Sequence, residues 1–149
     1  MKLPQYITTE EVQRVCRELG IRDWTALAEA VVSVEEAQVI QAAVGGEASQ
    51  ITTAEFRRGL EVELEHGLQF PDANVTNNHP LLTGKIVLAH LKETLDYYSR
   101  LEVAELEGDI LTALVKGDSN KVAEKYRKLV FARLALSTSE TGQLESSGR

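Results

Sequence analysis

Residues 79–102 read HPLLTGKIVLAHLKETLDYYSRLE, and this stretch decides the fold class. Its apolar residues recur every three or four positions, which is the spacing of a helical face. We therefore predict one long helix that begins at about Thr83, as its cap, and reaches Leu106 or beyond. Apolar side chains fall on two nearly opposite sides of it. A helix of this kind lies at the centre of a bundle or pairs with another chain.

The pattern of the rest of the chain also predicts helices, with ordinary start and stop signals. A short second helix is expected over RDWTALAEAVV, and a last one over NKVAEKYRKLVFARLAL. The predicted starts are Thr8 or Thr9, Asp23, Ser33 with Glu36 in a capping box, Thr52 or Thr53, and Asp118 or Ser119, and the predicted stops are Gly20, Gly45 and Gly67. Trp24 is expected to anchor the core of the N-terminal helices.

Composition favours the same class, because hydrophobic residues make up 43% of the 149 residues and there are only 3 prolines. We expect an all-α protein, a compact helical bundle of about five to six helices with one long irregular loop at residues 68–82. One helical domain is expected over residues 1–136, made of N-terminal helices (1–46), a helix–loop–helix (52–106) and C-terminal helices (107–136). Residues 137–149 form a polar tail that we expect to be flexible or to dock on a partner.

The charge balance excludes some classes of partner. The formal net charge is -7, and no basic stripe is visible, so nucleic-acid binding is not expected. Cys16 is the single cysteine, which excludes an intrachain disulfide and a thiolate metal cluster. Without an apolar signal core or a stretch of membrane-spanning length, a cytoplasmic protein without a membrane contact is expected.

Polar residues interrupt the apolar faces on both sides of the long loop. Glu63 lies within the apolar arc of its helix, and His66 follows one turn later. Beyond the loop, His90, Glu93 and Tyr97 share a stripe with apolar residues. If the two helices pack antiparallel, these five side chains can converge.

Two interpretations of this cluster stay open, beside a third in which it binds another ligand or is catalytic. In the first, Glu63, His66, His90 and Glu93 hold a divalent transition metal, because Glu-x-x-His is the spacing of di-iron bundles. That pattern is incomplete, since the second pair is reversed as His-x-x-Glu. In the second, the four residues and Tyr97 form a buried hydrogen-bond network that locks the loop to the helices.

The words GLEVELEHG at residues 59–67, TGKIVLAHL at 83–91 and DYYSRL at 96–101 occur in the order found in one family. Over Glu55 to Glu102 the chain resembles an uncharacterised domain family of bacteria and their phages. The chain departs from that family at Asn78-His79, where acidic residues are usual, and at Leu95, where proline is usual. The resemblance implies no established activity, but it places some relatives in phages.

The sequence favours a small acidic helical module for interaction or assembly, phage-related or oligomeric, with a protein partner or a second copy. The alternative is a metal-binding helical bundle that uses the Glu/His cluster. Enzymatic activity stays open, with the balance against it, because no nucleophile motif is complete.

Overall fold

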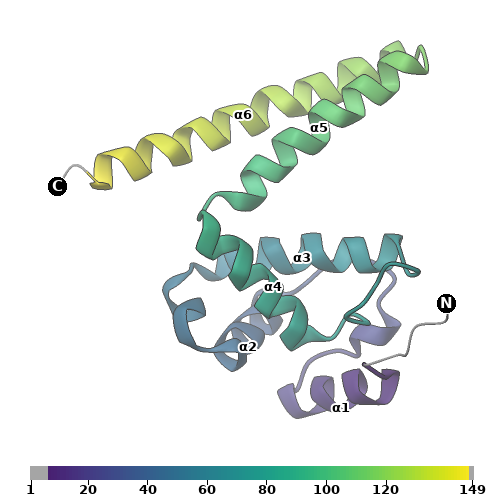
Figure 1. The fold of residues 1–149 in the computed structure, drawn as a ribbon, viewed down its shortest axis with the longest axis vertical. Helices are drawn as coiled ribbons and strands as arrows, with labels where there is room; N and C mark the ends of the chain where they lie inside the picture. Colours follow the sequence, from purple (N-terminus) through teal and green to yellow (C-terminus); the bar gives the residue numbers. More distant parts are fainter. Residues whose placement is uncertain (1–6, 148–149) are drawn as a thin grey trace. The chain divides into compact units, whose positions relative to one another are not determined.

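The computed structural model describes residues 7–147, with side chains up to residue 145. Within that range the chain is all-α, with six α-helices, two short 3-10 helices and no strand, which confirms the predicted class (Figure 1). None of the helices in that range is both long and apolar enough to cross a membrane. Contacts divide the chain into two compact units, the first ending at Glu93 and the second beginning at Thr94.

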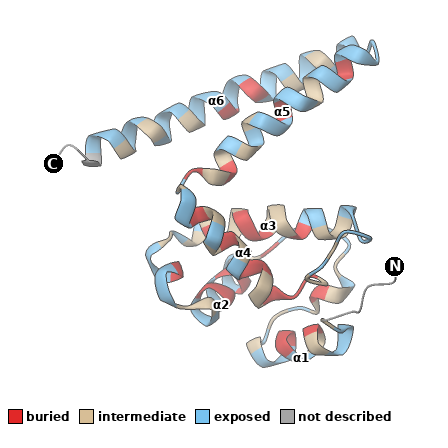
Figure 2. Ribbon diagram, in the orientation of Figure 1, coloured by how far each residue is buried: buried red, intermediate tan, exposed pale blue. Residues whose placement is uncertain are grey.

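The first unit is a small bundle in which α3 packs against both α2 and α4, and α1 contacts η1 and α4. Its elements are α1 (Thr9–Leu19), η1 (Trp24–Ala26), α2 (Val34–Val44), η2 (Gly46–Gln50), α3 (Thr53–Gln69) and α4 (Pro80–Glu93). Trp24, Phe56 and Leu60 are all 0% exposed, so the expected anchoring role of Trp24 is confirmed. The buried positions gather on the facing sides of these helices (Figure 2).

Local hydrogen bonds explain where the first helices begin. The Thr8 hydroxyl accepts from the amide of Glu11, and Ser33 and Glu36 form the predicted capping box. The buried Glu36 carboxylate also accepts three bonds from Arg22: from its amide, and from Nε and Nη2 at 2.9 and 2.6 Å. This carboxylate therefore ties the segment after α1 to the start of α2.

Gly84 sets how closely α4 approaches the rest of the first unit. A Cβ atom at this position would lie 2.8 Å from Cγ2 of Val44 and 3.1 Å from Cγ2 of Ile40. Because two methyl groups already fill that space, a side chain here would push α4 away from α2. The glycine thereby fixes the α2–α4 packing that supports the loop before α4.

The second unit is a helical hairpin of α5 (Tyr97–Val115) and α6 (Ser119–Ser147), reversed at Gly117 with φ 70°. Its core cluster consists of Leu106, Leu129 and Ala132, with partly buried Val103 and Ile110 against it. The core positions of α5 are spaced by three and four residues, as in a coiled coil. Figure 2 shows α6 exposed along most of its length.

The long helix predicted from Thr83 to Leu106 is wrong, because α4 ends at Glu93 and α5 begins at Tyr97. The Asp96 carboxylate accepts from Nε and Nη2 of Arg100, both at 2.9 Å, and from the Thr94 hydroxyl. Such local side-chain bonds compete with helical geometry. α4 also starts earlier than expected, at Pro80, so Thr83 lies inside the helix instead of capping it.

Three smaller predictions also need correction. The second helix over RDWTALAEAVV is one 3-10 turn, although Asp23 caps it as predicted. Gly67 does not stop α3, which continues to Gln69. The last helix does not end near residue 136, because α6 continues to Ser147, so the tail that we expected to be flexible or to dock on a partner is helical. A single domain over residues 1–136 stays a prediction, since two compact units can still unfold together.

Candidate functional site

The candidate site lies where α3, the following loop (residues 70–79) and α4 meet in the first unit. Gly67, inside α3, makes this arrangement possible. A Cβ atom there would lie 2.1 Å from the Asn78 side-chain oxygen and 3.0 Å from the Asn74 amide nitrogen. The missing side chain thus lets two asparagines of the loop rest directly on the helix.

Asn74 organises the loop through its side-chain amide. Its nitrogen donates to the Gly67 carbonyl at 3.1 Å and to the Asn78 side-chain oxygen at 2.8 Å. Its oxygen accepts from the Thr76 hydroxyl at 3.2 Å. Asn77 and Asn78 have φ of 50° and 56°, the left-handed region that asparagine tolerates better than most residues. The loop is therefore held by side chains rather than by regular backbone pairing.

His79 ends the loop and occupies the position before the first residue of α4. It is 6% exposed, and its Nδ1 accepts from the Leu82 amide at 3.4 Å. Burial lowers the pKa of His79, and the charge of Arg14 acts in the same direction, while Glu11 opposes both. An accepting Nδ1 requires a neutral ring, so the bond and the lowered pKa agree.

The predicted Glu/His cluster assembles in part. His90 Nε2 lies 3.5 Å from Glu63 Oε1, with the two side chains 29% and 16% exposed. His66 lies on the exposed side of α3, and Glu93 is the exposed last residue of α4. Tyr97 belongs to the second unit, where its ring meets that of Tyr98 edge to face at 5.2 Å.

No group of three or more histidine, cysteine or carboxylate side chains in the described part of the chain is placed to hold a metal ion. Glu63 and His90 by themselves offer two ligands, fewer than the three protein ligands of catalytic zinc sites. The predicted metal site therefore has no geometric support from this cluster and stays a prediction.

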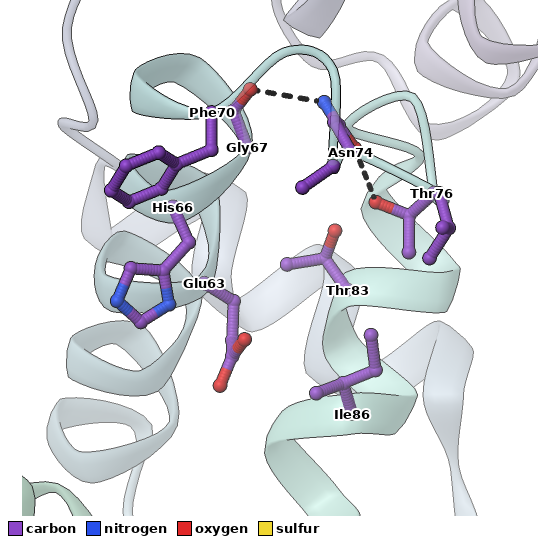
Figure 3. A pocket seen from close by; sticks show the side chains of 10 residues that line it. Glu63, His66, Gly67, Phe70, Asn74, Thr76, Thr83 and Ile86 are labelled. Atoms are coloured by element: carbon purple, nitrogen blue, oxygen red, sulfur yellow. Dashed lines mark hydrogen bonds between the residues drawn. The ribbon is translucent and has the colours of Figure 1, made fainter.

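A pocket of about 200 Å³ opens beside Glu63, between α3, the loop and α4 (Figure 3). It is lined by Glu63, His66, Gly67, Phe70, Ala73, Asn74, Val75, Thr76, Thr83 and Ile86. The lining combines one carboxylate and several hydrogen-bonding groups with apolar walls, which is the usual make-up of a small-molecule site. The pocket and the Asn74 network depend on the same loop.

Sequence reasoning identified Glu63 and His66 but missed the loop residues and the glycine that build this pocket. The sequence pattern assigned Gly67 to helix termination. The signal that could have found the loop residues is the pair Asn77-Asn78 before His-Pro. Adjacent asparagines that tolerate left-handed φ, followed by a helix-starting proline, indicate an ordered turn rather than a flexible loop.

A family model described as "Protein of unknown function (DUF5661)" matches residues 12–107, which is more than half of the chain. The chain belongs to this family. The matched range contains every residue that lines the pocket, and it ends within α5. The expected membership in an uncharacterised family is thus confirmed, over a longer range than the quoted motifs covered. No curated protein and no solved structure matches the chain.

Proposed function

We propose that this protein is an assembly module that self-associates through its α5–α6 hairpin. The observation that carries this proposal is an exposed apolar stripe on α6. Tyr126, Val130 and Leu134 follow at intervals of four residues and are 56%, 49% and 64% exposed, and the neighbouring Phe131 is 72% exposed. Large exposed apolar groups on one helix face are typical of interaction sites.

The small core of the hairpin supports the proposal. Leu106, Leu129 and Ala132 form its buried cluster, a small core for a unit of more than fifty residues. Scaffolds with so little buried apolar surface usually need a disulfide, a metal or association with another chain. Of these three, association is the one that the hairpin supports, because it has an exposed apolar surface.

α5 offers a matching surface for a second copy. Tyr97, Leu101, Ala104, Gly108, Leu111 and Val115 follow one another at alternating intervals of four and three residues. This seam falls on the opposite side of α5 from the positions that contact α6. Leu111 and Val115 at its far end are 64% and 81% exposed. An apolar heptad seam is the surface on which another helix packs.

Charge favours α6 of one copy on α5 of another over α6 on α6. Arg127 flanks the stripe on α6, whereas Glu105 flanks the seam on α5. Arg133 and Glu107 already pair with each other within one hairpin at 2.6 Å, so they do not enter this comparison. Two α6 stripes would bring like charges together, while α6 against α5 brings opposite charges together. We therefore propose a head-to-tail contact, which closes into a ring or extends into a filament.

Sedimentation velocity over a range of protein concentrations tests this function. We expect a concentration-dependent increase in mass for the natural sequence and a monomer for Val130→Glu. The matched control is Val31→Glu, which places the same charge at a 56% exposed valine of the first unit. A natural sequence that stays monomeric at high concentration, or a Val130→Glu variant that associates equally well, contradicts the proposal.

The metal-binding alternative rests on the Glu63–His90 pair, with a third ligand still to be supplied. Its test is a melting-temperature series with added divalent transition metals. A ligand that binds the folded state raises the melting temperature, and His90→Ala should remove that rise. An unchanged melting temperature in the natural sequence removes this alternative.

A further inference from the structure

The pocket between α3, the loop and α4 presents hydrogen-bond acceptors to whatever enters it. Glu63 contributes a carboxylate that is 16% exposed. Thr83 is 3% exposed, and its hydroxyl oxygen can accept a hydrogen bond from a ligand. In Figure 3 both side chains border the same space between the two helices. Ionised carboxylates accept hydrogen bonds and cannot donate them.

The loop turns its donors away from this space. Both bonds donated by the Asn74 side-chain nitrogen are made within the protein, to the Gly67 carbonyl of α3 and to the Asn78 side chain. The Thr76 hydroxyl donates to the Asn74 oxygen, which leaves the lone pairs of Thr76 as its remaining hydrogen-bonding capacity. The loop side of the pocket therefore suits a ligand that brings donors, as does the Glu63 carboxylate on its helical side.

The remaining walls are apolar and end in an aromatic ring. Ala73, Val75 and Ile86 line the pocket, and Phe70 stands at its edge with 50% of its surface exposed. The pocket volume is about 200 Å³, below the range of about 300–1,000 Å³ that is usual for pockets of drug-sized ligands. The pocket thus accommodates a short alkyl chain with one polar head rather than a nucleotide or a large cofactor.

We propose that this pocket binds a primary alkylammonium group. The ammonium carries three donors and one positive charge, which match the Glu63 carboxylate and the hydroxyl oxygens of Thr76 and Thr83. The alkyl chain lies along Ile86 and Val75, and the face of Phe70 adds a cation–π contribution. A free amine and a lysine side chain share this chemistry. The site lies in the first unit and is independent of association through the hairpin.

Titration with n-butylammonium, followed by two-dimensional NMR of the full chain, tests the proposal. We expect saturable shifts at the pocket residues of the natural sequence. n-Butanol, with the same chain and no charge, should bind at least about tenfold more weakly, because a hydrogen bond to a charged group contributes about 1.5–3 kcal/mol.

Two variants and a matched control assign the binding to this pocket. Glu63→Gln should weaken n-butylammonium binding about tenfold or more, whereas Glu65→Gln, at an exposed position of the same helix, should leave it unchanged. Phe70→Leu keeps apolar bulk at an exposed position and should weaken binding about two- to fivefold. Retained NMR dispersion in each variant shows that the fold is intact.

N-acetyl-lysine N-methylamide, used as a second probe, distinguishes the two sources of the ammonium group. Tighter binding of this probe identifies a lysine side chain as the ligand, and tighter binding of n-butylammonium identifies a free amine. Three outcomes overturn the proposal: no saturable shift with either probe, equal affinity for n-butanol, or Glu63→Gln binding as the natural sequence does.

Discussion

The two units of this chain use the same kind of element in different ways. The first unit joins short helices with loops that are fixed by side-chain hydrogen bonds, and its core contains residues with no exposed surface, such as Phe56 and Leu60. The second unit consists of two long helices that pack around a small apolar core. Because burial of an apolar face is what stabilises a helix in a protein, we expect the longer helices of the second unit to be the less stable ones.

The largest expected effect is a separation of the two unfolding transitions in dilute protein. Trp24 is the single tryptophan and lies in the first unit, whereas circular dichroism reports helix in both units. A first unit of this size should have a free energy of unfolding of about 5–10 kcal/mol, whereas an isolated hairpin is only marginally stable. In a urea titration we expect circular dichroism to change before Trp24 fluorescence. Coincident transitions would instead establish the single cooperative domain that the sequence analysis predicted.

The next largest effect compares one ion pair from each unit. Glu36→Ala should lower the free energy of unfolding of the first unit by about 3 kcal/mol, because it leaves Arg22 without its buried partner and removes the capping box. Glu107→Ala should cost less than about 1 kcal/mol, since Glu107 and Arg133 are each at least half exposed. Urea unfolding of both variants checks this. If both substitutions lowered the free energy of unfolding equally, burial would not explain a difference between the two ion pairs.

Glycine substitutions sharpen the comparison, because one helical glycine in each unit can be changed to alanine. Gly67→Ala should destabilise the first unit by about 1–3 kcal/mol, since the new Cβ meets Asn78 at 2.1 Å and displaces the loop. Gly108→Ala should stabilise the hairpin by about 0.5–1 kcal/mol, because a Cβ there meets nothing within 4 Å. Melting temperatures of both variants, measured in dilute solution, provide the check. A shift of the same sign in both would contradict the packing role of Gly67.

How far the sequence predicted the structure follows from how local each signal is. The caps at Thr8, Asp23 and Ser33 were predicted because each hydrogen bond joins residues two or three positions apart. Gly67 was misread because its role depends on Asn78, eleven positions later, and no local rule contains that contact. Glycine near a helix end has two explanations, termination and close approach, and the local sequence does not separate them.

The sequence predicted the helical half of the candidate site. Periodicity placed Glu63 and His90 on the inner sides of two consecutive helices, and the structure has them 3.5 Å apart. Periodicity has no equivalent for an irregular loop, so the arrangement of Asn74 and Thr76 could not be derived. The break at residues 94–96 was missed for a related reason. Asp96 bonds to Thr94, two positions earlier, and to Arg100, and the Asp96–Arg100 pair has the four-residue spacing of an ordinary helix surface.

The smallest expected effect is a pH dependence that comes from the buried His79 of the first unit. Burial lowers the pKa of His79 in the folded chain, so the unfolded chain binds more protons between the folded and unfolded pKa values. The free energy of unfolding should therefore fall as pH drops below about 6.5, by at most about 1.4 kcal/mol per pH unit for one proton.

Urea unfolding followed by Trp24 fluorescence at several pH values measures this dependence. His79→Asn keeps a side-chain acceptor at the start of α4 and cannot titrate, so its stability should vary less with pH. His66→Asn, at an exposed position, should keep the dependence of the natural sequence. If His79→Asn retains the full slope, another group titrates on unfolding. The helix start at Pro80 would then not depend on a neutral His79, and the asparagines would hold the loop instead.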